Sequence, residues 1–351
     1  NLMFFASDNS SPAHPNVMEA LVNANKGYTS GYGDEEAMDG VRKNIRELFE
    51  APDAAVYLVA TGTAANALAL ATLTKPWETI FCHRNSHIEE DECGAPEFYT
   101  HGSKLTLVDG SDAMMTPDNL QTAIDYTGRI GVHNVQRGSL SITNVTEFGT
   151  VYSLEKIQSL TKQAHESGIK THLDGARFAN AMVALDCTPA QLTWKSGIDV
   201  VSFGGTKNGC LGVEAVIFFD PQMAWEFELR RKRGGHLFSK HRVLSAQMEG
   251  YLADELWINL ARQANQAGQK LAAELSKFSE IEFIHPTHAN LIFASWSRST
   301  HEKLAAKGAK YNYWPADPTS TGSPEEKISA RLACSWSTTD TEIAQLLSCF
   351  S

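Results

Sequence analysis

Short apolar runs alternate with amphipathic helical patterns between about residues 55 and 220, and no other feature restricts the possible folds as strongly. The runs are rich in β-branched and aromatic residues, and several are apolar on both faces. Such strands are typical of a mostly parallel sheet that helices cover on both sides. We expect strands at residues 54–62, 78–83, 104–109, 139–144, 170–174, 199–205 and 215–220. The chain is therefore predicted to contain an α/β domain with a mostly parallel, seven-stranded sheet.

The segments on either side of this region have other patterns. Amphipathic helices are expected at residues 16–27 and 35–50, with a glycine-rich loop between them. After residue 243, a long helical pattern leads to a mixture of strands, a helix and turns, which is typical of a small α+β domain. Because 351 residues exceed one ordinary hydrophobic core, we divide the chain into two parts. Residues 1–242 are predicted to form an N-terminal segment plus the large domain, and residues 243–351 the small C-terminal domain.

The composition excludes several classes of protein. Hydrophobic residues make up 42% of the chain and charged residues 20%, which excludes a disordered chain, and no apolar run approaches the ~20 residues of a membrane span. The 30 basic and 41 acidic residues give a net charge of −11, which argues against broad binding to nucleic acid. The six cysteines form no C-x-x-C pair, so no metal site and no disulfide framework is expected. Without a signal-peptide pattern at the start, the expected location is the cytoplasm.

The first motif with chemical meaning is ATGTAAN at residues 60–66, where the first expected strand gives way to a helix. Small residues such as Gly62 and Thr63 at a helix N-terminus leave backbone N–H groups free, and the helix dipole adds positive charge there. Together these features make a seat for a phosphate group. Taken alone, an ordinary N-capped helix explains the motif about as well.

The second motif is Asp174, at the end of the strand expected over residues 170–174. Ligands of doubly wound sheets bind at the carboxyl ends of the strands. An aspartate in that position can keep a pyridine nitrogen protonated, which turns the ring into an electron sink. The alternative is an N-cap for the helix that follows.

The third motif is SFGGTKNG at residues 202–209, just past another apolar strand. Glycines on both sides of Lys207 indicate that something approaches the backbone closely, because glycine otherwise costs conformational order. A lysine that forms a Schiff base needs a near-neutral amine in a partly desolvated pocket, and the neighbouring Thr206 can bind a phosphate. A surface lysine in a glycine-rich loop is the less favoured interpretation.

The three motifs together are more specific than any one of them, because the lysine follows the aspartate by 207 − 174 = 33 positions and both follow the helix start. The segments ATGTAAN, HLDGARFANA and SFGGTKNG resemble those of fold-type-I enzymes that use pyridoxal 5'-phosphate (PLP). They resemble most closely the L-threonine aldolases, in particular the low-specificity branch that also accepts phenylserine. The resemblance covers nearly the whole chain, from residues 5–15 to residues 329–339.

This resemblance implies roles for residues around the cofactor. Lys207 would hold PLP as a Schiff base, and Asp174 would pair with the pyridine nitrogen. Gly62, Thr63 and Thr206 would contact the phosphate. His87, in SHIEEDECGAPE, resembles the histidine that stacks on the cofactor ring, and its alternative is a capping or core histidine.

The resemblance also implies how substrate and neighbouring subunits are contacted. Ser7, Arg177 and Arg331 resemble the residues that hold the substrate carboxylate, and Arg177 would also contact the cofactor. Members of the family are homotetramers, built from dimers that share active sites. Tyr32 and Arg242 would then reach the substrate and the cofactor of a neighbouring subunit, although turn packing and a solvated helix charge explain them almost as well.

One departure from the family concerns the base that takes the proton of the substrate's β-hydroxyl. Many threonine aldolases carry an E-N-T-H-type segment with a second active-site histidine, whereas residues 142–147 here read ITNVTE. The candidates that remain are His87, Asp91, His133 and a water bound to the phosphate.

The implied reaction is the reversible cleavage of L-threonine, L-allo-threonine, phenylserine or related β-hydroxy amino acids to glycine and an aldehyde. A β-eliminating lyase or an enzyme similar to serine hydroxymethyltransferase is the alternative within PLP chemistry. A nucleotide-binding Rossmann protein is the alternative outside it. It ranks lower because no G-x-G-x-x-G follows the first strand and Lys207 would have no role.

Overall fold

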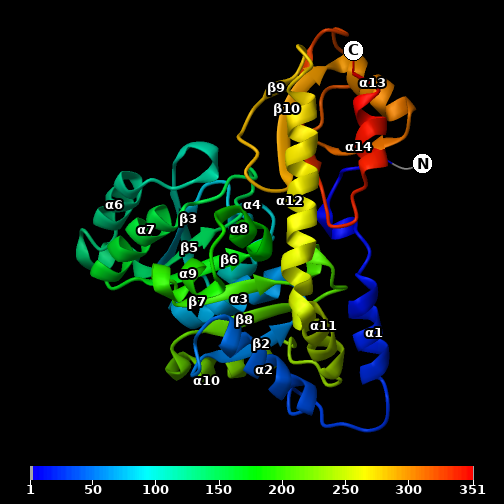
Figure 1. Cartoon of the computed structure of the whole chain (residues 1–351). Coiled ribbons are helices and arrows are strands. Elements are labelled where there is room, and N and C mark those ends of the chain that lie inside the picture. Colours follow the sequence, from blue (N-terminus) through cyan, green and yellow to red (C-terminus); the bar gives the residue numbers. More distant parts are fainter. Residues whose placement is uncertain (1–2, 351) are drawn as a thin grey trace.

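The structure, a computed structural model, describes residues 3–350. Its larger domain is built around a seven-stranded sheet with the strand order β2-β8-β7-β6-β5-β3-β4 (Figure 1). The strands are β2 (Ala55–Val59), β3 (Glu78–His83), β4 (Lys104–Val108), β5 (Gln136–Thr143), β6 (Lys170–Gly175), β7 (Val200–Gly204) and β8 (Glu214–Phe218). Neighbouring strands are parallel except for β8, which runs antiparallel to β2 and β7. The predicted mostly parallel, seven-stranded sheet is confirmed.

Alternate residues along the strands face two separate layers of helices. On β8, Ala215 and Ile217 belong to the core on one face, whereas Val216 and Phe218 belong to the core on the other. The second face is covered by α3 (Gly62–Leu73) and α10 (Ala224–Arg233). The first face is covered by α2 (Glu36–Leu48), α6 (Pro117–Tyr126), α7 (Leu154–Glu166), α8 (Phe178–Leu185) and α11 (Arg242–Leu252). Short helices α4 (His87–Glu90), α5 (Ala95–Tyr99) and α9 (Pro189–Leu192) lie in the connections.

The smaller domain has a core of its own and lies at one end of the long helix α12 (Leu256–Leu275) (Figure 1). Its antiparallel sheet has the order β12-β13-β10-β9, with β9 (Glu282–Phe283), β10 (Leu291–Ser297), β12 (Asn312–Tyr313) and β13 (Lys327–Ala333). Helices α13 (Arg298–Ala306) and α14 (Asp340–Leu347) complete this core. The predicted small α+β domain is thus present at the C-terminal side of the chain.

Two segments near the chain's start connect the domains. Strand β1 (Met3–Phe4) pairs in parallel with β11 (Ala309–Lys310) of the smaller domain. Helix α1 (Pro15–Ala24) packs instead on α11 of the larger domain. The division after residue 242 stays a prediction. Strand β1, from the start of the chain, packs with the smaller domain, and α11, which begins at residue 242, packs in the core of the larger domain. No helix within residues 3–350 is long and apolar enough to cross a membrane.

Candidate active site

A pocket of about 230 Å³ lies where the parallel strands of the large sheet end, which is the usual ligand position in such sheets. It brings together the three predicted motifs, which are far apart in the sequence. Its lining residues are Asn9, Ala60, Thr61, Gly62, Thr63, Asn66, His87, Glu92, Asp174, Ala176, Thr206, Lys207 and Glu214.

The N-terminus of α3 forms one wall of this pocket. Thr61 is the N-cap, and its Oγ1 accepts a hydrogen bond from the backbone N–H of Ala64 (3.1 Å). The N–H groups of Gly62 and Thr63, in the first turn, have no acceptor within the helix. Because both residues line the pocket, their position agrees with the expected phosphate seat.

Lys207 lies in the turn Thr206–Asn208, directly after β7. A Cβ at Gly204 would come within 2.5 Å of the carbonyl oxygen of Ala176, and Gly209 has a φ of +115°. Glycine is therefore required on both sides of the lysine, as the motif indicated. Within residues 3–350 no hydrogen bond or ion pair engages the Lys207 amine, which lines the pocket. The amine is free to react with a bound carbonyl compound.

Asp174 is buried near the end of β6. Its Oδ1 accepts from the backbone N–H of Ala176 (3.1 Å), and its Oδ2 accepts from Nδ2 of Asn66 (3.0 Å). Burial raises the pKa of Asp174, although the charges of His87 and Lys207 act in the opposite direction. Since both hydrogen-bond donors are neutral, a protonated pyridine nitrogen would supply the positive partner that this buried carboxylate needs.

His87 begins the short helix α4 and lines the pocket beside Asp174. Its Nδ1 lies 2.6 Å from Oε1 of Glu92. Burial lowers the pKa of His87, but the hydrogen bond to Glu92 and the negative charges of Glu147 and Asp174 outweigh burial and raise it to about 9. In this structure the His87 ring is therefore positively charged at neutral pH.

Glu214 is a third carboxylate of the pocket, beside Asp174 and Glu92, and the sequence did not single it out. It begins β8, it is buried, and its Oε2 accepts from the backbone N–H of Gly205 (3.0 Å). Burial raises the pKa of Glu214 to about 7, against the effects of the Thr206 hydrogen bond and the Lys207 charge. A carboxyl group with that pKa is partly protonated at neutral pH.

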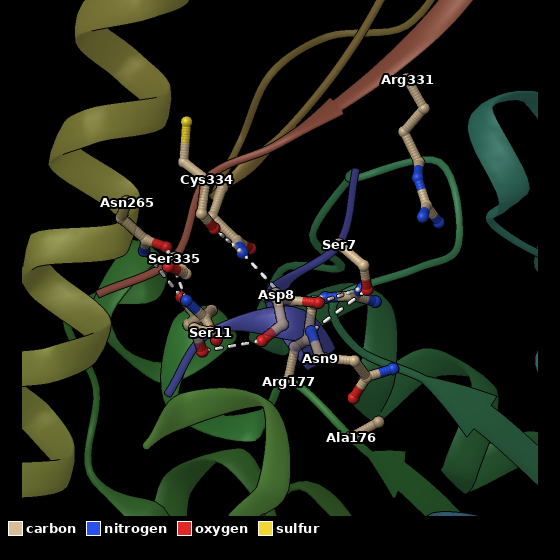
Figure 2. Close-up of polar contacts among 12 residues, drawn as sticks. Ser7, Asp8, Asn9, Ser11, Ala176, Arg177, Asn265, Arg331, Cys334 and Ser335 are labelled. Carbon is tan, nitrogen blue, oxygen red and sulfur yellow. Dashed lines mark hydrogen bonds and ion pairs between the residues drawn. The ribbon is translucent and has the colours of Figure 1, made fainter. Parts of the chain in front are cut away.

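Arg331 lies on β13 of the smaller domain and extends toward the segment that carries Ser7 (Figure 2). One guanidinium nitrogen donates to the carbonyl oxygen of Ala6 (3.1 Å), and the group lies 5.8 Å from the centre of the Trp314 ring. In the described part of the chain no carboxylate forms an ion pair with Arg331, and its Nε is buried without a partner. Burial and the charge of Arg177 lower the pKa of Arg331. An unpaired, partly buried guanidinium is suited to binding an anion.

The expectation that Arg177 holds the substrate carboxylate needs correction, because its guanidinium already binds Asp8. It donates to both carboxylate oxygens of Asp8, over 2.7 Å and 2.9 Å, and both side chains are buried (Figure 2). Burial alone would raise the pKa of Asp8, yet the Arg177 charge and hydrogen bond lower it to about 2. Arg177 therefore anchors the N-terminal segment rather than offering a free fork to a substrate carboxylate. Ser7, whose Oγ accepts from the N–H of Asn9 (3.1 Å), begins the turn that this ion pair holds.

Two of the candidate bases lie outside the pocket. His133 is exposed in the turn before β5. It lies at the N-terminal end of that strand, roughly 25 Å along the strand from the site at the C-terminal end. The position of His133 thus contradicts its role as a base. Asp91 is exposed at the end of α4 and does not line the pocket, although its charge acts on Arg331. Of the three side chains proposed, only His87 lines it.

Tyr32 and Arg242 do not line this pocket either. Tyr32 is half exposed with a φ of 58°, and its ring lies 4.8 Å from the Lys232 amine. Arg242 donates to the carbonyl oxygens of Ala24 and Gly27 at the end of α1. Their role at a neighbouring subunit's site stays a prediction.

The chain is similar to known proteins over nearly its full length. The family model described as beta-eliminating lyase matches residues 5–297. A low specificity L-threonine aldolase of Pseudomonas sp. (strain NCIMB 10558) is 38% identical over 97% of this chain and 95% of that protein, and one of Pseudomonas aeruginosa is 36% identical over the same shares. A solved structure of threonine aldolase from Leishmania major superposes with a TM-score of 0.90 at 26% identity, covering 98% of this chain and 97% of that one.

Proposed function

The chain belongs to the beta-eliminating lyase family and is a lyase of the L-threonine aldolase type, and from this premise we propose its reaction. The reaction is cleavage of L-β-hydroxy-α-amino acids at the Cα–Cβ bond, which gives glycine and an aldehyde, with pyridoxal phosphate as the cofactor. The observation that carries the proposal is the pocket itself. It combines an unengaged lysine amine, a buried aspartate without a cationic partner and a helix N-terminus. Relatives at 36–38% identity carry the name of this activity.

The residues that would hold the cofactor follow from these contacts. Lys207 would bind it covalently, Asp174 would pair with its ring nitrogen, and His87 would lie against its ring. Backbone N–H groups at the start of α3, with Thr206, would bind its phosphate. When bound, pyridoxal phosphate supplies an electron-withdrawing ring that accepts the electron pair of a bond broken at Cα.

Substrate orientation is assigned to Arg331, with Ser7 beside it. A guanidinium grips a carboxylate through two parallel hydrogen bonds, which fixes the direction of the bonds at Cα as well as attracting the substrate. Arg177 acts on substrate binding indirectly, because its ion pair with Asp8 holds the turn that begins at Ser7. Free rotation of the substrate would let several bonds at Cα compete, so this orientation selects the bond that is cleaved.

A broad substrate range and the reversibility of the reaction are also part of the proposal. Without a second histidine in residues 142–147, the side of the pocket that meets the β-substituent is less tightly specified. We expect cleavage of L-threonine, L-allo-threonine and phenylserine, and the reverse addition of glycine to an aldehyde. The test is a product assay with each amino acid. Equimolar glycine and aldehyde support the proposal, whereas a keto acid with ammonia would identify a β-eliminating lyase, and activity confined to threonine would contradict the breadth.

Assembly and location complete the proposal. We propose that the protein is cytoplasmic and forms a homotetramer, in which Tyr32 and Arg242 reach the site of a neighbouring subunit. Exposed aromatic side chains at Tyr28 and Tyr32, in the loop after α1, support such a contact. Sedimentation of the purified protein tests the number of subunits.

Replacement of Arg331 by lysine is expected to lower kcat/KM on the order of 10²-fold, equivalent to about 2.7 kcal/mol of transition-state stabilisation. Lysine keeps the positive charge but loses the planar pair of donors. The cofactor's absorption spectrum should stay the same, because Arg331 does not contact the groups proposed to hold it. Steady-state kinetics and spectra of the same preparation measure both effects.

Arg298→Lys is the matched control, since Arg298 is a buried arginine of the smaller domain whose partner is Glu326. It should leave kcat/KM close to wild type. An unchanged kcat/KM in Arg331→Lys would show that Arg331 serves only the structure.

A further inference from the structure

A buried carboxylate lies behind the histidine that lines the pocket. The Glu92 side chain has no exposed surface, and its Oε1 lies 2.6 Å from Nδ1 of His87. Nδ2 of Asn66 donates to the same oxygen over 2.9 Å. Within residues 3–350 no hydrogen bond engages Nε2 of His87, and the side chain is 29% exposed. The ring is therefore held at one nitrogen, and its other nitrogen remains available to a ligand.

The same cluster extends to the aspartate proposed to meet the cofactor. Asn66 Nδ2 donates to Asp174 Oδ2 (3.0 Å) as well as to Glu92, so one amide joins the two carboxylates. Asn66 comes from α3 and Asp174 from β6, which fixes the cluster to the rigid part of the domain. Oε2 of Glu92 and Oδ1 of Asn66 are buried without partners in the described part of the chain. Buried oxygens without partners cost free energy, which is typical of groups that a protein keeps for a functional reason.

The charges around the cluster determine its protonation. The groups that act on His87 are the carboxylates of Glu92, Asp174 and Glu147. Burial and the charge of Asp174 raise the pKa of Glu92, and His87 and Asn66 act in the opposite direction. The nearby cations are Lys207, which acts on Asp174, and Arg177, which is paired with Asp8 and also interacts with Asp174 and Glu147. Because carboxylates outnumber cations here, the cluster retains a proton at neutral pH, and the His87 ring carries it.

We propose that Glu92 is a positioning residue, and this inference rests on the proposed function. Glu92 holds Nδ1 of His87, so that the Nε2–H of the ring faces the pocket and donates a hydrogen bond to a substrate oxygen. During cleavage that oxygen is the one on Cβ, which becomes the carbonyl oxygen of the aldehyde. In the reverse direction the same donor polarises the aldehyde. A donor fixed in advance stabilises the developing charge without reorganisation. His87 then acts as a donor and not as the base, and the hydroxyl proton passes to a water at the phosphate seat as the Cα–Cβ bond breaks.

The direct test is the titration of His87 in the full-length, cofactor-free protein, followed by NMR with labelled histidine. The signal is assigned as the one missing from His87→Gln. Wild-type His87 is expected to titrate near pH 9, well above an ordinary histidine. A midpoint at or below 6.5 in the wild type would overturn the proposal, whatever the variants do.

Glu92→Gln removes the charge and keeps the shape, so the midpoint of His87 should fall by at least about one pH unit. Glu97→Gln is the matched control. Glu97 is a partly buried glutamate of the same segment. Its Oε2 is buried without a partner in the described part of the chain, and burial also raises its pKa, but it does not line the pocket. It should leave the midpoint unchanged. An unchanged midpoint in Glu92→Gln would also contradict the proposal.

Kinetics of the cofactor-loaded enzyme give the second measurement. Glu92→Gln should lower kcat on the order of tenfold, in the range of residues that orient a ligand-contacting histidine, with little change in KM. A purely structural role would instead lower the yield of folded protein and leave kcat per bound cofactor unchanged. If the wild type cleaves no β-hydroxy amino acid, the proposed function fails, and the titration still tests the link between Glu92 and His87.

Discussion

Replacement of Lys207 by alanine is expected to abolish covalent binding of the cofactor and to lower cleavage at least about 10⁴-fold, equivalent to about 5.5 kcal/mol. The amine lines the pocket without an internal partner, and the glycines around it are required by the backbone. Alanine removes the amine together with the rest of the side chain beyond Cβ but leaves the backbone unchanged, so the turn after β7 should keep its structure. Borohydride reduction of the loaded wild type should fix the cofactor to the peptide that contains Lys207. The variant should show no such labelled peptide.

Lys195→Ala provides the matched control, because Lys195 is a surface lysine that pairs with Glu50. It should leave cofactor labelling and cleavage at wild-type levels. Thermal unfolding of both variants checks that each is folded. Normal cleavage by Lys207→Ala would contradict the assignment of this lysine and with it the proposed reaction.

The sheet was predictable because its signals are local. Apolar runs of four to eight residues and glycine-rich turns report strands and their ends without knowledge of the rest of the chain. The motifs around Gly62, Asp174 and Lys207 each follow such a strand, so their convergence at one edge follows from parallel pairing. The start of the chain was less predictable, since the pairing of β1 with β11 depends on two segments far apart in sequence.

The partners of site residues were not predictable in the same way. Arg177 and Asp8 are 169 positions apart, and nothing in either motif indicates that one neutralises the other. Glu92 stands in an acidic run in which several carboxylates look equivalent, and only burial distinguishes it. Asn66 was within reach of sequence reasoning, because it follows Gly62 by one helical turn and so shares its face.

The missing histidine has a structural counterpart that the sequence motif alone did not identify. Residues 142–147 end in Glu147, which is buried, and its charge acts on His87, Asp174 and Arg177. Within residues 3–350 no hydrogen bond engages the Glu147 carboxylate. The segment thus contributes negative charge to the site. The charge favours the protonated form of His87, and this agrees with the donor role that we propose for that ring.

Replacement of Asp174 by asparagine is expected to lower kcat on the order of 10²–10³-fold, equivalent to about 2.7–4 kcal/mol, while the protein still folds. Asparagine keeps the shape, and its oxygen can still accept from Ala176 or Asn66, but the negative charge is lost. A ring nitrogen opposite a neutral amide has no reason to stay protonated, so the ring withdraws electrons less strongly. Steady-state kinetics and the absorption spectrum of the loaded variant measure the effect.

The same substitution is expected to lower kcat without lowering the free energy of unfolding, and this combination makes the prediction specific. Burial raises the pKa of Asp174, so in the cofactor-free protein its charge is a cost, and removing that charge should leave the free energy of unfolding unchanged or increased above the ordinary carboxyl pKa. Asp199→Asn is the control, because Asp199 lies just before β7 at the other edge of the sheet, where it accepts from the N–H of Thr171 and pairs with His165. That change should lower stability and leave kcat per bound cofactor intact. A variant of Asp174 that kept activity within a few-fold of wild type would show that the ring nitrogen does not depend on this carboxylate.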